Sequence, residues 1–163
     1  MTVRDRLWLF ASRAHDDDIW LGKGRANRFS CWSRITPAEG AAMLDIPNVV
    51  MIVSDGIPVP YSADAYGYME SFCRMKNVVW SITGSSGFRA GNEEKFICHL
   101  AEKYPNVTGA FADDFLGGGS VPEEKRKLVS DIRRTLDTAC RPLSMWLTVY
   151  GQDLETCDTS VYG

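Results

Sequence analysis

Three stretches of the chain repeat one pattern: PNVVMIVS (47–54), KNVVWSIT (76–83) and PNVTGAFA (105–112). In each stretch an asparagine and a valine open an apolar run, and the three asparagines stand 29 residues apart. The runs are apolar nearly throughout rather than alternating, which is typical of parallel strands covered on both faces. Two similar runs, RLWLFAS (6–12) and SMWLTVYG (144–151), flank the repeats. The sequence therefore predicts five parallel strands.

Segments with helical signals separate these strands. In TPAEGAAMLDI (36–46), Thr36 is placed to be the N-cap, Pro37 occupies the first helical position and Glu39 completes a capping box. The same pattern predicts a helix that starts at Ser120, with Glu123 as its capping partner. Two further segments with helical patterns are YSADAYGYMESFCRM (61–75) and NEEKFICHLAEKY (92–104).

Alternating strands and helices predict a (β/α) repeat with right-handed crossovers. An open, doubly wound sheet is disfavoured because no G-x-G-x-x-G motif follows the first strand. We therefore expect residues 1–163 to form a single domain, a partial TIM barrel of about five parallel strands in sequential order with helices on the outer side. A complete barrel has eight strands and typically about 250 residues. The sequence thus resembles the first five-eighths of a barrel.

Composition restricts the function classes. The chain has 163 residues, 45% of them hydrophobic and 24% charged, and its net charge of −3 provides no broad basic surface for nucleic acid. No apolar run approaches the roughly 20 residues that cross a bilayer, and the N-terminus lacks the pattern of a signal peptide. The five cysteines include no C-x-x-C pair, so neither a disulfide framework nor a zinc site is indicated. We expect a cytoplasmic protein that acts on a small molecule without a metal or cofactor.

Polar and acidic residues follow the predicted strands. In parallel α/β architectures the carboxyl ends of the strands meet at one mouth, where active sites form. The sequence therefore predicts a common site from the residues at these ends, namely His15, Asp16, Asp55, Thr83, Asp113, Asp114 and Tyr150.

Several of these stretches resemble a family of uncharacterised bacterial TIM-barrel proteins that are similar in appearance to glycoside hydrolases. The resemblance is carried by IPNVVMIVSDGIPVP (46–60), KNVVWSITGSSG (76–87), YPNVTGAFADDFLGG (104–118) and WLTVYGQDLE (146–155), and Asp-Asp-Phe (113–115) is its most recognisable part. It implies a barrel with a carbohydrate-type site and supplies no substrate. In such proteins the repeat continues through further strands, whereas this sequence ends after the fifth.

Glycoside hydrolysis requires two carboxyl groups, one protonated as a general acid and one ionised as a nucleophile or base. Asp113 or Asp114 is the candidate acid, and the second carboxylate would come from Asp55, Asp153 or a later strand. Strict alternation from Val107 would place Asp113 on the face of Phe111 and Asp114 on the opposite face, which leaves both candidates open. A structural alternative is that the two aspartates cap the next helix or bind backbone amides in the loop.

Tryptophans can stack on the apolar faces of sugar rings. Trp20 and Trp32 are the candidate platforms because they lie in a long irregular stretch, whereas Trp80 and Trp146 lie within strands and are expected in the core. Two functions follow: a glycosidase-like enzyme, or a sugar-binding module without complete chemistry. Because the first and last strands lack protective lysine or proline and have inner faces without a partner, we also expect a homo-oligomer that joins exposed barrel edges.

Overall fold

The computed structural model describes residues 2–14, 34–54, 56–84, 87, 89–115, 122–151 and 155. A short 3-10 helix, η1 (Arg4–Arg6), precedes the first strand. The five strands are β1 (Trp8–Ser12), β2 (Asn48–Ile52), β3 (Asn77–Ser81), β4 (Val107–Ala112) and β5 (Ser144–Leu147). The four α-helices are α1 (Pro37–Leu44), α2 (Ala63–Ser71), α3 (Glu93–Lys103) and α4 (Glu123–Leu136).

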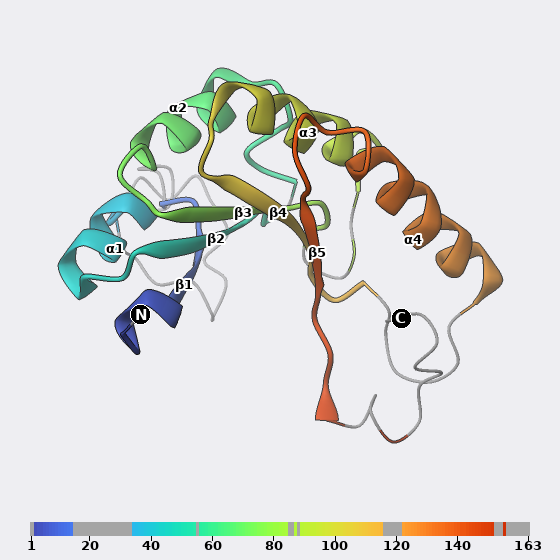
Figure 1. Ribbon diagram of the computed structural model, residues 1–163, viewed down its shortest axis with the longest axis horizontal. Coiled ribbons are helices and arrows are strands. Elements are labelled where there is room, and N and C mark those ends of the chain that lie inside the picture. The colour runs from blue at the N-terminus through green and yellow to red at the C-terminus, as the bar shows by residue number, and fades with distance from the viewer. Residues whose placement is uncertain are drawn as a thin grey trace, which may run out of the picture.

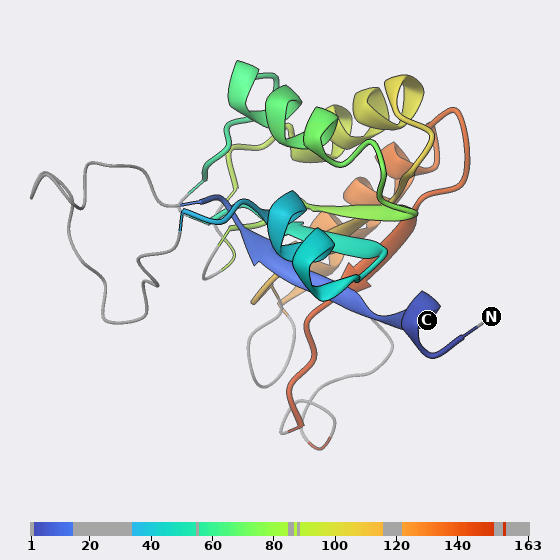
Figure 2. The ribbon, with the colours of Figure 1, turned by 90° about the vertical axis from the view of Figure 1, so that its left-hand side faces the viewer.

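The strands form one parallel sheet in the order β1-β2-β3-β4-β5, as the repeat predicted. Figure 1 shows that the sheet is curved and that the four helices lie in an arc along its convex side. The view in Figure 2 shows the same two layers, with the helices on one side of the sheet. The fold is an α/β repeat consistent with part of a barrel. None of the described helices has the length and apolar character that crossing a membrane requires.

The repeated asparagines connect the amino ends of neighbouring strands. The side-chain amide of Asn48, which is fully buried, donates to the backbone carbonyls of Leu7 and Asp5 at 2.7 and 3.0 Å. Asn77 donates to the Asn48 side-chain oxygen at 2.6 Å, and Asn106 donates to the Phe72 and Met75 carbonyls. The bonds from Asn48 and Asn106 satisfy backbone carbonyls near the amino ends of the strands, and the bond from Asn77 satisfies the Asn48 side-chain oxygen.

The N-cap residue forms a side-chain capping bond at the starts of α1 and α2 but not at those of α3 and α4. The predicted capping box of α1 is confirmed: the Thr36 side chain accepts from the Glu39 amide, and the Glu39 carboxylate accepts from the Thr36 amide. The predicted start of α4 at Ser120 is wrong, because the helix begins at Glu123 with Pro122 as its N-cap. Proline has no side-chain acceptor, so the first turn of α4 lacks a side-chain capping bond.

Two apolar clusters cover the two faces of the sheet. The larger cluster packs one face of β2, β3 and β4 against the helices and includes fully buried Trp80, as predicted. The smaller cluster covers the concave face and brings together Trp8 of β1 and Trp146 of β5, whose ring centroids are 4.6 Å apart. The expectation that the inner faces of the two outer strands lack a partner is therefore wrong. The sheet curves enough for the first and last strands to touch through these rings.

One irregularity changes the face pattern of β4. The register between β3 and β4 shifts between Val78 and Val79, so that Val78 pairs with Val107 and Val79 pairs with Gly109. Val107 therefore packs in the helix-side cluster, whereas Phe111 packs in the concave cluster. The prediction that Val107 shares a face with Phe111 is wrong, because it assumed strict alternation without a bulge.

Candidate functional site

The turn after β4 places two carboxyl groups at the carboxyl end of the sheet. Asp113 and Asp114 follow the last residue of β4 directly, and Asp114 has a φ of +47°, which aspartate tolerates better than most residues. Both aspartates are partly buried. Since Phe111 lies in the concave cluster, alternation from it places Asp113 on the concave side.

Hydroxyl groups from both neighbouring strands hold Asp113. The Thr148 hydroxyl, just beyond β5, donates to Asp113 Oδ1 at 3.0 Å. The Thr83 hydroxyl, just beyond β3, donates to the Asp113 backbone carbonyl at 2.7 Å. Asp113 thus joins the ends of three strands and has limited freedom to reorient.

Asp114 has a separate partner. The phenolic hydroxyl of Tyr150 donates a hydrogen bond to Asp114 Oδ1, and the Tyr150 side chain remains about half exposed. The four described residues predicted for the site, Thr83, Asp113, Asp114 and Tyr150, are therefore connected by two direct hydrogen bonds and one peptide bond. We refer to Asp113 and Asp114 below as the acidic pair.

The environment raises the pKa of Asp113. Burial is the main cause because it disfavours the charged form, and the neighbouring Asp114 charge raises the pKa further. The Thr148 hydroxyl and the Asp114 backbone amide act in the opposite direction, since they stabilise the ionised carboxylate. The direction agrees with the prediction that like charges raise the pKa of one carboxyl, although burial contributes more than charge.

The structural alternative is wrong in its first half, because the N-cap of α4 is Pro122 and not an aspartate. Its second half holds for Asp113, whose carboxylate accepts the backbone amide of Asp114. Five predicted substrate-binding residues lie outside the described part of the chain: His15, Asp16, Trp20, Trp32 and Asp55. Asp153, a candidate for the second carboxylate, also lies outside it. Among the described residues, no three histidine, cysteine, aspartate or glutamate side chains are grouped as metal ligands would be.

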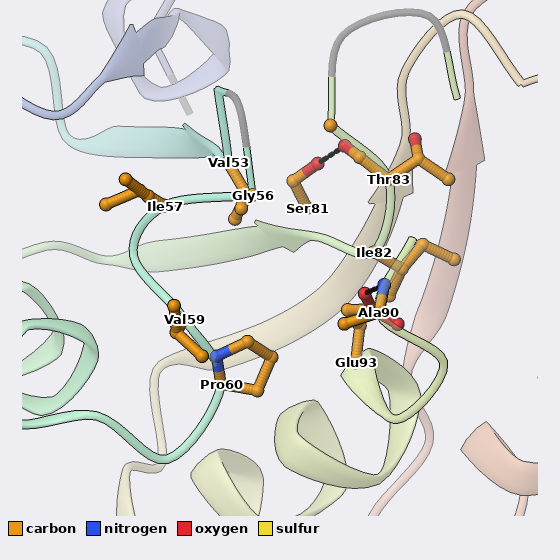
Figure 3. A pocket seen from close by; sticks show the side chains of 11 residues that line it. Val53, Gly56, Ile57, Val59, Pro60, Ser81, Ile82, Thr83, Ala90 and Glu93 are labelled. Carbon is orange, nitrogen blue, oxygen red and sulfur yellow. Dashed lines mark hydrogen bonds between the residues drawn. The ribbon is translucent and has the colours of Figure 1, made fainter. Parts of the chain in front are cut away.

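A pocket that the sequence did not predict lies next to the acidic pair. It has a volume of about 230 Å³ and opens between the segment that follows β2 and the segment that leads from β3 into α3. Thr83 lines this pocket and also holds the Asp113 carbonyl, so the two sites share a residue. Figure 3 shows Val59 and Pro60 on one side of the pocket and Ala90 and Glu93 on the other. Its apolar lining side chains are Val53, Ile57, Val59, Pro60, Ile82 and Ala90.

A buried ionic cluster fixes one wall of this pocket. The Arg89 guanidinium lies 2.5 Å from a Glu94 carboxylate oxygen and 3.6 Å from one of Glu93, and the three side chains are 9 to 11% exposed. Glu93 also accepts hydrogen bonds from the backbone amides of Ala90 and Gly91. Because the Arg89 and glutamate charges are paired and hydrogen-bonded, these side chains can stay buried and keep this wall of the pocket rigid.

Comparison with known proteins gives no match, whether with protein-family models, with curated proteins or with solved structures. What the site does is therefore inferred from its own geometry and chemistry.

Proposed function

We propose that the chain is a glycoside-hydrolase-like, carbohydrate-active protein whose site is the acidic pair. The observation that carries this proposal is the placement of two carboxyl groups at the carboxyl ends of the strands, each bonded to a hydroxyl group of the chain after β5. Carboxylates and hydroxyls are the groups that bind sugar hydroxyls, and the carboxyl ends of the strands are where barrel enzymes bind their substrates.

The two carboxyl groups have different roles in this proposal. Asp113 is the general acid, because its raised pKa keeps a larger fraction protonated toward neutral pH than an ordinary aspartate. It would donate its proton to the glycosidic oxygen as the bond to the sugar breaks. Asp114, which accepts from Tyr150, is the carboxylate among the described residues of the site that would balance the positive charge that develops on the sugar.

The remaining predicted residues complete the proposed binding surface. Thr83 and Tyr150 border the acidic pair and are the described candidates for substrate contacts. His15, Asp16, Trp20, Trp32 and Asp55 remain predictions from the sequence.

One observation favours a second candidate, a sugar-binding module that does not cleave its ligand. Asp113 and Asp114 are consecutive residues of one turn. Glycosidases place their carboxyl groups on either side of the scissile bond, about 5 to 9.5 Å apart. Without a second carboxylate across the mouth, the acidic pair would hold sugar hydroxyls and leave the glycosidic bond intact.

A parallel binding and turnover assay tests both candidates. Calorimetry with mono- and oligosaccharides measures binding, and release of reducing sugar from the same oligosaccharides and from alkyl glycosides, whose leaving groups require a proton, measures hydrolysis. For an enzyme we expect Asp113→Asn to lower kcat by roughly 10² to 10⁴, the usual contribution of a general acid. Asp64→Asn, in the first turn of α2, is the matched control and should leave turnover unchanged.

The outcomes separate the candidates. Saccharide binding without turnover, weakened by Asp113→Asn or Asp114→Asn, would identify the binding module. Wild-type protein that neither binds nor cleaves any member of the panel would overturn the proposal. Variants of the acidic pair that bind and turn over as the wild type does would also overturn it.

A further inference from the structure

The pocket beside Thr83 has the size and lining of a binding site for a compact apolar group. Its volume is about 230 Å³, whereas an engineered apolar cavity of about 150 Å³ already binds benzene. Six of its lining side chains are apolar, and they come from the segment before α2 and from the β3–α3 connection. A benzene-sized group would therefore fit there and be removed from water.

The polar groups of the pocket already have partners within the protein. Both oxygens of the Glu93 carboxylate accept backbone amides, and one of them also faces Arg89. The Ser81 hydroxyl donates to the Thr83 carbonyl, and the Thr83 hydroxyl donates to the Asp113 carbonyl. A ligand gains little from these satisfied groups, so apolar contact is the interaction that the pocket offers.

The pocket is also connected with the acidic pair. Thr83 forms part of its wall, and the Thr83 hydroxyl donates to the backbone carbonyl of Asp113, so this residue links the pocket wall to the turn that carries the acidic pair. The ionic cluster at the start of α3 keeps the wall in place before any ligand arrives, which lowers the entropic cost of binding.

We propose that this pocket binds a compact apolar group of about the size of a benzene ring, carried by a ligand whose polar part lies at the acidic pair. This inference rests on the proposed function for the polar part of the ligand. It narrows the substrate class to saccharides with a small apolar substituent.

Benzyl alcohol is a suitable probe because it contains the apolar group and no glycosidic bond. We expect it to bind with a Kd on the order of 1 mM, as measured by NMR, and to shift the amide signals of Thr83 and Gly84, both of which line the pocket. The amide of Gly67 in α2 should not shift, since α2 contributes no lining residue.

Val59→Trp should weaken this binding at least about tenfold, because the larger side chain fills the pocket. Val59 is 55% exposed, so the substitution need not disturb the core. Val3→Trp is the matched control at a residue that is 81% exposed and does not line the pocket. Val59→Phe provides a milder block should the tryptophan variant not fold.

The probe separates this inference from the proposed function. Absence of benzyl alcohol binding, or equal binding by wild type and the folded Val59 variants, would overturn the pocket assignment whatever the glycoside assays show. Benzyl alcohol binding that is lost in the Val59 variants supports the pocket. If no saccharide binds, the carbohydrate proposal and the saccharide substrate class fall, and the apolar pocket stands. Benzyl alcohol binding that persists in Asp113→Asn supports the assignment of the apolar group to the pocket, and binding lost in Asp113→Asn but kept in the Val59 variants would overturn it.

Discussion

Gly109 of β4 is the position where one methyl group should have the largest effect on both sheet and site. A Cβ atom there would lie 2.5 Å from the backbone oxygen of Ser144, its partner in β5, and 3.3 Å from the Ser144 carbonyl carbon. Carbon and oxygen do not approach that closely, so β5 would have to retreat by roughly 0.5 to 1 Å. The residues that follow β5 include Thr148 and Tyr150, which hold the acidic pair, so this movement reaches the site.

The expected magnitude follows from two opposing effects. Overpacking in a well-packed region costs about 1 to 3 kcal/mol. Replacing glycine by alanine also reduces the entropy of the unfolded chain, which stabilises the folded state by about 0.4 to 1 kcal/mol. We therefore expect Gly109→Ala to lower the free energy of unfolding by about 0.5 to 2 kcal/mol, a large fraction of the stability of a small domain.

Urea denaturation followed by circular dichroism measures this change. Gly67→Ala is the control of opposite sign, because no atom beyond its chain neighbours and the backbone of its own helix lies within 4 Å of the added Cβ, and the residue sits in the middle of α2. It should raise the free energy of unfolding by about 0.5 to 1 kcal/mol. A Gly109→Ala variant as stable as Gly67→Ala would refute the close approach of β4 and β5 and the register derived from it.

Two further predictions concern the acidic pair and the edges of the sheet. The pKa of Asp113 is higher in the folded protein than in the unfolded chain, so the folded protein binds more protons at pH values above the ordinary aspartate pKa. The contribution of Asp113 to the free energy of unfolding therefore falls as the pH rises from the ordinary aspartate pKa through the raised pKa. Asp113→Asn removes this pH-dependent loss, so the free energy of unfolding of the variant, relative to that of the wild type, should increase from about pH 4 to about pH 7 in urea titrations. A relative free energy of unfolding that decreases over this range would contradict the burial argument. Within the described residues, β1 and β5 each pair with one neighbouring strand only, so we expect a dimer that joins these edges. A monomer in analytical ultracentrifugation at micromolar concentration would rule this dimer out.

The repeat in the sequence was enough to predict the strand order, because continuous apolar runs separated by helices permit few arrangements of a sheet. The strand ends were less accurate. RLWLFAS was predicted as a strand from Arg6 onward, but η1 ends at Arg6 and β1 begins at Trp8. SMWLTVYG was predicted as a strand to Gly151, but β5 ends at Leu147. The runs predicted for the inner strands also overshoot by one or two residues at an end, as 76–83 does against β3. The largest error, four residues, is at the end of β5, an outer strand with a single neighbour.

The bulge in β4, where Thr108 lies between the residues paired with Val78 and Val79, and the pocket had no comparable signal. A bulge depends on the close approach of two particular strands, which a hydrophobic pattern does not contain. The pocket is lined mainly by apolar loop residues, such as those of Gly-Ile-Pro-Val-Pro (56–60), and a search for polar residues at strand ends passes over them. Thr83 was predicted from its position after β3, but its bond to Asp113 depends on the placement of two neighbouring strands.

The two ends of the sheet differ in a way that bears on function. At the amino ends, Asn48, Asn77 and Asn106 donate to acceptors within the protein, so these polar groups contribute to stability. At the carboxyl ends, the raised pKa of Asp113 means that folding disfavours its ionised form, so this group lowers stability at neutral pH. Retaining a carboxyl group at such a cost is expected where it binds or transfers a proton, which is the role proposed for Asp113.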